Sequence, residues 1–401
     1  MRRKGGRGMS EWKKVKLGEV CDTQYGFTAS TVQQDTGTQF LRITDIVPQL
    51  IDWNTVPYCQ IQEKDREKYL LHKGDIVVAR TGATVGYAKY IKEDVPAVFA
   101  SYLVRLLVNS IDVDRHYVGL CLESNLFKEY IQSISNGSAQ PNANAQMISS
   151  FEINLPPLST QHRIATILSR YDSLIENYQK QIKLLEEAAQ RLYKEWFVHL
   201  CFPGHENTNI TNGVPEGWEK KSIGEIGEYL NGFAFKPSDW QELGKPIIKI
   251  KEMGNGVTNE TPRNSGERVP AKYLIKAGDL LFSWSATLMV IIWSGEEGWL
   301  NQHLFKVTPV KGIDREFLLQ SISNTIVEFQ NLTTGSTMKH IQRNKLDQVF
   351  VNVPNAEIMK RYSDISEKTR NNILSLQSQL RLLTEARDRL LPKLMNGEIA
   401  V

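Results

Sequence analysis

An internal duplication constrains this chain of 401 residues more than any other feature of its sequence. Matching residues recur at a constant offset of 206, namely Trp12 and Trp218, Gly18 and Gly224, and Phe27 and Phe233. A period of about 200 residues is too long for a solenoid repeat and indicates duplicated domains. We therefore expect two similar halves, each long enough to bury a core of its own.

The offset between the copies drifts in the front part of each half and is constant in the back part. It falls to 204 at Asp75 and Asp279, and to 198 at Pro156 and Pro354. It stays at 198 while residues 161–196 run against residues 359–394 without a gap. Each half is therefore a module of variable length followed by a segment of fixed length.

The fixed-length segment of the first half has the pattern of one long helix. From Ile164 to Trp196 its apolar residues follow one another at steps of three and four, which is a near-heptad seam. Pro156 and Pro157 stop the preceding structure, and no Gly or Pro follows before Pro203. The pattern predicts a helix over residues 158–199, in which roughly 37 residues would extend for about 55 Å.

The second half repeats this pattern over residues 355–401. Asn355 can cap the start of the helix, and Gly397 can close its end in the left-handed conformation. Each helix has an apolar seam that needs cover, and the other copy is the nearest partner. We expect the two helices to form an antiparallel coiled-coil pair, with a linker over residues 200–213 leading into the second half.

The two variable modules, over residues 9–157 and 214–354, have the pattern of mixed α/β domains. Short runs rich in β-branched and aromatic residues, such as 75–79 and 102–107, end at Gly, Pro or Asp turns. Polar residues interrupt the apolar run 280–293, which is too short to span a bilayer, so we expect a pair of core strands there. The predicted fold is α+β, with the two modules at opposite ends of the helix pair in a pseudo-twofold repeat.

Net charge gives no support for a nucleic-acid ligand. The formal charge is +3, but four basic residues precede Met9, so the remainder carries +3 − 4 = −1. Residues 1–8 are predicted to be a disordered N-terminal extension, and Met9 is a candidate for the true start of the protein. Mass spectrometry of the native protein decides between Met1 and Met9.

The remaining sequence offers no recognisable catalytic or metal-binding pattern. The four cysteines, Cys21, Cys59, Cys121 and Cys201, lack the spacing typical of zinc or redox sites. We expect free thiols in a reducing cytoplasm. The chain has no Gly-rich dinucleotide turn, no phosphate-binding loop and no helix face with two histidines. No catalytic group and no metal site are therefore predicted.

Polar and aromatic residues at strand ends and turns are the candidates for binding. Arg, Lys, Asn and Gln read base edges in the major groove, while Ser, Thr and Lys bind phosphates. In the first module the candidate DNA-binding residues are Tyr25, Arg42, Thr44, Arg80, Thr81, Thr84, Lys89, Tyr102, Gln140 and Asn142. In the second module they are Phe235, Lys236, Lys249, Lys251, Ser283, Trp284, Ser285, Gln302, His303, Lys339 and His340. A solvated loop or a cap is the alternative for each residue alone, and only the duplicated placement favours binding.

The order of the motifs points to a known family. Leu155-Pro156-Pro157-Leu158 precedes the first helix, Pro215-Glu216-Gly217-Trp218 restarts the second module, and Leu394-Met395-Asn396-Gly397-Glu398-Ile399 closes the chain. Each motif is common, but their order and spacing together are specific. Over residues 9–401 the chain resembles the specificity subunit of type I restriction-modification enzymes.

This resemblance implies a DNA-recognition subunit without catalytic activity of its own. The two modules would be target recognition domains that bind double-stranded DNA, and the helices would be spacers. Two modification subunits would carry S-adenosylmethionine and methylate adenine at N6. Two restriction subunits would use ATP and Mg to translocate and cleave DNA. The chain itself would bind no cofactor, no metal and no membrane, and would read a bipartite asymmetric site whose gap the spacer helices set.

Two alternatives belong to other classes. A coiled-coil adaptor that binds protein rather than DNA fits the helix periodicity alone, and sequence-dependent, salt-sensitive DNA retention would exclude it. An enzyme that acts alone, such as a fused methyltransferase, would transfer label from S-adenosylmethionine to DNA without a partner.

Overall fold

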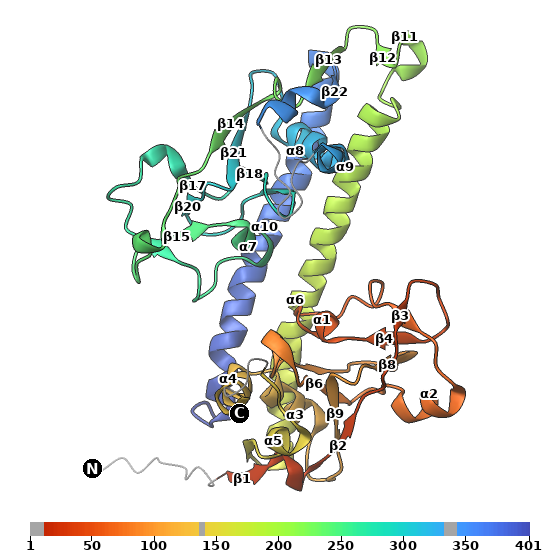
Figure 1. Ribbon diagram of the computed structural model, residues 1–401, viewed down its shortest axis with the longest axis vertical. Helices are drawn as coiled ribbons and strands as arrows, with labels where there is room; N and C mark the ends of the chain where they lie inside the picture. The colour runs from red at the N-terminus through yellow and green to blue at the C-terminus, as the bar shows by residue number, and fades with distance from the viewer. Residues whose placement is uncertain (1–11, 136–140, 333–342) are drawn as a thin grey trace, which may run out of the picture. The chain divides into compact units, whose positions relative to one another are not determined.

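The computed structural model describes residues 12–135, 141–332 and 343–401. These residues form two compact units (Figure 1). The first unit takes in the described residues up to Asn177 together with Leu382–Val401, and the second takes in Tyr178–Arg381. Each unit thus contains one variable module and a part of each long helix.

Two four-stranded sheets form the body of the first unit. The antiparallel sheet has the order β2 (Cys21–Tyr25), β9 (Leu103–Val108), β6 (Ile76–Ala79) and β7 (Ala88–Tyr90). The other sheet has the order β3 (Thr31–Val32), β5 (Tyr58–Cys59), β4 (Gln39–Leu41) and β8 (Ala97–Phe99), with β4 and β8 parallel. A separate pair joins β1 (Lys13–Lys16) to β10 (Glu152–Leu155). The helices are α1 (Ile43–Ile46), α2 (Glu63–Tyr69), α3 (Arg115–Leu122), α4 (Asn125–Ser135) and α5 (Ala145–Ser149).

The second unit repeats the antiparallel sheet strand for strand, and its other sheet keeps the parallel pair but differs in its other strands. Its antiparallel sheet has the order β14 (Gly227–Asn231), β21 (Leu304–Pro309), β18 (Leu280–Ser283) and β19 (Met289–Ile292). Its other sheet has the order β16 (Arg263–Asn264), β15 (Lys245–Ile248), β20 (Gly298–Leu300) and β17 (Leu274–Ile275), with β15 and β20 parallel. The remaining strands are β11 (Ile210–Thr211) with β12 (Val214–Pro215), and β13 (Glu219–Ser222) with β22 (Phe350–Val353). The helices are α7 (Ile250–Asn255), α8 (Arg315–Asn324) and α9 (Ile326–Asn331). The prediction of two core strands in residues 280–293 is confirmed, because β18 pairs with β19.

Both long helices form where the apolar periodicity predicts them. Helix α6 covers Leu158–Tyr193 and is followed by a π-helical segment at Lys194–Val198. Helix α10 covers Ala356–Met395. The Asn355 side chain accepts a hydrogen bond from the backbone N–H of Ile358 at 3.0 Å, and Gly397 has a φ of 77°. Asn355 therefore caps the start of α10, and Gly397 has the left-handed conformation after its end, as the sequence predicts.

Within each unit, the early part of one long helix contacts the late part of the other. In the first unit Arg387 of α10 forms an ion pair with Asp172 of α6 at 3.1 Å. In the second unit the rings of Trp196 and Phe197 lie 6.0 and 4.9 Å from the ring of Tyr362. The helices are therefore part of the packing of each unit rather than a free stalk.

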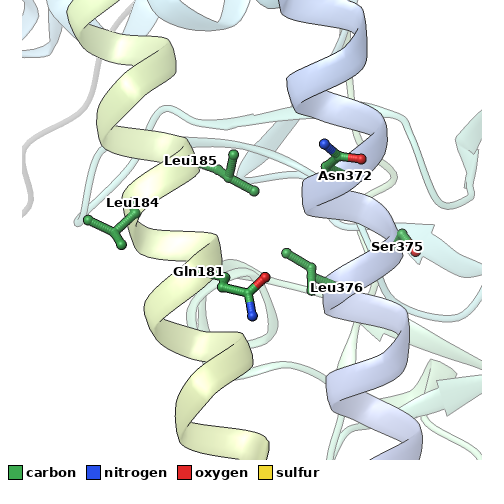
Figure 2. Close-up of a pocket in the computed structure, with 6 residues that line it drawn as sticks. All are labelled: Gln181, Leu184, Leu185, Asn372, Ser375 and Leu376. Carbon is green, nitrogen blue, oxygen red and sulfur yellow. The ribbon is translucent and has the colours of Figure 1, made fainter.

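The middle of the two helices is more loosely packed in the second unit. An open groove of about 520 Å³ is lined by Gln181, Leu184, Leu185, Asn372, Ser375 and Leu376. Leu185 and Leu376 point toward one another across it, whereas Leu184 points away from α10 (Figure 2). Leu184 is 64% exposed, so the apolar seam is only partly covered there.

The cysteines are free thiols, as their spacing predicts. Cys21, Cys59 and Cys121 are buried, and Cys201 is exposed. Burial raises the pKa of Cys21 to about 12, which keeps this thiol protonated and unreactive at neutral pH. No helix in the described part of the chain is both long and apolar enough to cross a membrane.

Candidate nucleic-acid interface

Strand pairing brings five of the predicted residues of the first module together. Strand β2 ends at Tyr25, β6 ends one residue before Arg80, and β9 begins one residue after Tyr102. The backbone N–H of Arg80 donates to the carbonyl oxygen of Tyr102 at 3.0 Å, and Thr81 forms a β-bridge with Asn142. We call Tyr25, Arg80, Thr81, Tyr102 and Asn142 the Arg80 cluster.

The Arg80 cluster presents hydrogen-bond donors beside aromatic rings. Tyr25 is 44% exposed and Tyr102 is 60% exposed. The Arg80 guanidinium carbon lies 5.0 Å from the centre of the Tyr25 ring, and its Nη2 donates to Oδ1 of Asn142 at 3.3 Å. The backbone N–H of Ala145 donates to the Tyr25 hydroxyl at 3.0 Å. The guanidinium is thus held by a ring and an amide, which leaves further donors for a ligand.

Other candidates of the first module have partners within the protein. The guanidinium of Arg42 forms two hydrogen bonds to Asp45, at 3.0 and 2.8 Å, and this bonding raises the pKa of Arg42. Lys89 Nζ donates to the carbonyl oxygen of Gln49 at 2.9 Å, and burial lowers the pKa of Lys89. Thr44 is exposed on α1, and Thr84 closes the 3-10 turn Gly82–Thr84. Gln140 lies outside the described residues.

The second unit builds an equivalent cluster at the ends of the equivalent strands. Strand β14 ends at Asn231, β18 ends one residue before Trp284, and β21 begins one residue after His303. The backbone N–H of Trp284 donates to the carbonyl oxygen of His303 at 3.4 Å, and the rings of these two residues lie 5.6 Å apart. Trp284 Nε1 donates to Oδ1 of Asn231 at 3.1 Å. With Gln302, whose amide lies 3.3 Å from His303 Nε2, these residues form the Trp284 cluster.

The same backbone geometry supports both clusters. Gly26 donates from its backbone N–H to Leu103 at 3.2 Å, and Gly232 donates to Leu304 at 3.0 Å. A Cβ atom at either glycine would collide with a carbonyl oxygen, that of Ala100 or that of Asn301. Glycine is therefore required at both positions for the close approach of two strands. The scaffold is repeated, but the cluster side chains are different.

Three candidate residues of the second module have buried side chains. Ser283 is fully buried, and its hydroxyl donates to the carbonyl oxygen of Thr287 at 2.5 Å and accepts from Met289 N at 2.9 Å. Ser285 is 3% exposed and Phe235 is 9% exposed. The Phe235 ring packs 4.9 Å from the ring of Phe233. These side chains therefore pack within the turn and the core of the module.

The other candidates of the second module lie at its surface. Lys236 is exposed, and Lys251 pairs with Glu260 at 3.2 Å. Lys249 Nζ lies 4.4 Å from the ring centre of Trp240, which is 49% exposed. Lys339 and His340 lie outside the described residues.

Two residues of interest were missed by sequence reasoning. Asn231 holds the position of Tyr25 in the repeat, and the offset of 206 could have identified it. No sequence pattern predicted that Trp240 is exposed, because its exposure depends on the backbone turn that follows Pro237–Asp239. No group of three or more His, Cys, Asp or Glu side chains that could hold a metal occurs among residues 12–135, 141–332 and 343–401. The chemistry these clusters offer is hydrogen bonding and stacking.

Several known proteins are similar to this chain in sequence or in fold. A family model described as type I restriction modification DNA specificity domain matches residues 9–187 and 215–381. The specificity subunit of the type I restriction enzyme MjaIX from Methanocaldococcus jannaschii is 25% identical over 348 residues, which are 82% of this chain and 78% of the relative. The specificity subunit of the HindI enzyme from Haemophilus influenzae is 25% identical, across 98% of this chain and 100% of the relative. The crystal structure of the S subunit from M. genitalium has the same fold, with a TM-score of 0.56, 15% identity and 98% coverage of both chains.

Proposed function

Because this chain belongs to the family of type I restriction-modification specificity subunits, we propose that it reads a bipartite, asymmetric DNA site with one variable module for each half-site. The observation that carries this proposal is the pair of equivalent clusters. The Arg80 cluster and the Trp284 cluster occupy equivalent strand ends in two antiparallel sheets of the same topology. Their side chains differ, so the two modules would read different bases.

The long helices would set the distance between the two half-sites. Helices of 36 and 40 residues extend for about 54 and 60 Å at a rise of 1.5 Å per residue. Such a length corresponds to at most roughly 16–18 base pairs at 3.4 Å each. In this proposal α6 and α10 run antiparallel as a coiled-coil spacer, and a pseudo-twofold axis relates the modules at its ends. The fixed length of the helical segments in the repeat supports this role.

The chain would act as the non-catalytic subunit of a larger complex. In the proposed assembly it recruits two modification subunits, which hold S-adenosylmethionine and methylate adenine at N6. Two restriction subunits would supply ATP- and Mg-dependent translocation and cleavage. The partly covered seam around Leu184, which is 64% exposed, is consistent with a helix surface that contacts a partner. A cytoplasmic location stays a prediction.

Mapping methylated adenines in DNA exposed to the complex tests the proposal. We expect two half-sites of different sequence, separated by bases that do not affect methylation. One continuous palindrome would contradict a bipartite asymmetric site.

A length change in the spacer tests the role of the helices. One helical turn inserted near Lys180, which is exposed on α6, should lengthen the gap and leave both half-sites unchanged. An altered half-site would show that the helices contact bases. The coiled-coil adaptor remains the alternative in which DNA retention shows no dependence on sequence.

A further inference from the structure

We infer that Arg80 reads a guanine in the major groove of one half-site, with Tyr25 and Asn142 as its positioning residues. This inference rests on the proposed function, and it adds the base and the side chain that recognises it. It also limits this form of recognition to the first module, because the equivalent residue of the second module is Trp284.

The Arg80 side chain has no acidic partner in the described part of the chain. Two other arginines of the first module have acidic partners in this structure: Arg42 pairs with Asp45 at 2.8 Å, and Arg105 pairs with Asp75 at 3.0 Å. In the described part of the chain, the guanidinium of Arg80 has Asn142 as its hydrogen-bond partner and pairs with no carboxylate. Its Nε atom is buried without a hydrogen bond. The Nη atoms of Arg80 therefore have N–H donors left for a ligand.

Tyr25 and Asn142 hold the Arg80 guanidinium in a fixed orientation. The Tyr25 ring lies 5.0 Å from the guanidinium carbon. Tyr25 itself is held at two points, by the pairing of β2 with β9 and by the hydrogen bond from Ala145 N to its hydroxyl at 3.0 Å. Asn142 Oδ1 accepts from Nη2 at 3.3 Å. A planar group held on one face and one edge loses less freedom on binding than a side chain that moves freely.

The donors of a guanidinium match the acceptors on the major-groove edge of guanine. Guanine presents two acceptors, N7 and O6, on its major-groove edge, and a guanidinium can donate to both at once. A phosphate contact does not require a planar group fixed by stacking, because a flexible ammonium also binds phosphate. Tyr102, which is 60% exposed, adds an aromatic surface beside the same strand ends.

The second module cannot read guanine in this way. Trp284 carries a single side-chain donor, and Nε1 already donates to Asn231 at 3.1 Å. Arg80 and Trp284 therefore occupy equivalent backbone positions of the repeat but carry different side-chain donors. A guanine that depends on this position should occur in one half-site and not in the other.

The test uses the complete modification complex and its map of methylated adenines. Arg80→Gln should remove the preference for guanine at one position of one half-site, with a loss of discrimination of roughly tenfold or more. The other half-site and the gap should stay unchanged. Arg66→Gln is the matched control, since Arg66 lies in the same module and pairs with Glu63 at 3.1 Å. It should leave every base preference unchanged.

A probe in the DNA makes the test independent of how well the variant folds. With the unaltered complex, 7-deazaguanine is placed at each guanine of the two half-sites in turn, which removes the N7 acceptor. Binding should weaken by roughly tenfold at one guanine, and Arg80→Gln should be insensitive to that replacement.

Three results would overturn the inference while leaving the bipartite site intact. They are half-sites without a G·C pair, no guanine whose N7 matters, or an Arg80→Gln complex that binds all sequences equally weakly with a smaller salt dependence, as expected for a phosphate contact. A continuous palindrome in the unaltered complex would instead contradict the proposed function itself.

Discussion

The Arg80 cluster and the Trp284 cluster are built on one backbone and carry different chemistry. In both units a glycine follows the first strand of the antiparallel sheet and lies close to a neighbouring carbonyl group. The residue after the third strand in sheet order contacts the last residue of the first strand. One unit places an arginine over a tyrosine there, and the other places a tryptophan against an asparagine. The duplication has kept the scaffold and changed the side chains at these strand ends.

The two units also carry different side chains at equivalent places near the late part of each long helix. We call the packing around Phe197 and around Met395 the helix junctions of the second and first unit. The second unit packs Phe197 against Phe317 and Tyr362, with 4.9 Å between ring centres in each case. At the equivalent place in the first unit Met395 lies with its sulfur 3.6 Å from that of Cys121. Aromatic rings therefore pack against one another at the junction of the second unit, whereas the sulfur-containing side chains of Met395 and Cys121 pack at that of the first.

The largest effect is expected from Phe197→Ala. Phe197 is 4% exposed, and removal of a buried ring leaves a cavity that costs about 3–5 kcal/mol in the free energy of unfolding. Chemical denaturation measures this loss. Phe350→Ala is the matched control, because Phe350 is 49% exposed and its loss should cost well under about 1 kcal/mol. Equal losses in the two variants would show that the junction is not part of the core.

Gly232→Ala should give the next largest effect. Its new Cβ would collide with the carbonyl oxygen of Asn301, which should cost about 1–3 kcal/mol and distort the Trp284 cluster. Gly254→Ala is the control in the same unit, since its nearest neighbour would be Met289 Cε at 3.8 Å. If Gly232→Ala unfolds at the same denaturant concentration as Gly254→Ala, the close approach of the strands is not required.

Asp172→Asn tests the ion pair that joins the helices in the first unit. Asp172 and Arg387 have side chains that are 17% and 20% exposed, so the loss should be about 1 kcal/mol, moderated by the second partner of Arg387, Asp388. Asp364→Asn removes an exposed pair with Lys360 and should change stability by less than about 0.5 kcal/mol. Thermal unfolding of both variants decides whether the buried pair contributes more than the exposed one.

The smallest effect is expected from Tyr25→Phe. The change removes only the hydroxyl that accepts from Ala145 N, which should lower the free energy of unfolding by about 0.5–1 kcal/mol. The ring remains beneath Arg80, so base preference in the first half-site should be weakened only slightly. A complete loss of recognition would mean that the hydroxyl itself contacts DNA.

The sequence predicted those features that depend on periodicity and repeat spacing. Steps of three and four residues predicted α6 and α10, and the interrupted apolar run predicted β18 and β19. Arg80 and Asn142 were candidates because the sequence places them at strand ends or turns. Their mutual contact depends on a β-bridge between Thr81 and Asn142, which no local sequence pattern predicts.

That some candidate residues have partners inside the protein has a common physical cause. Whether a serine at the end of a strand faces solvent depends on the turn that follows, and the turn after β18 folds back so that Ser283 donates to Thr287. Arg42 is engaged by Asp45, three residues later in the chain. That spacing is typical of a helix start, so sequence alone could have indicated a structural partner for Arg42.

The central claim is that each unit reads its own half-site. The most direct measurement compares the methylated-adenine maps of the complexes that contain Asn231→Ala and Tyr102→Ala. Asn231→Ala should relax base preference in one half-site only, and Tyr102→Ala should relax it in the other only, with the gap unchanged in both. A variant that alters both half-sites at once, or both variants altering the same one, would contradict the account.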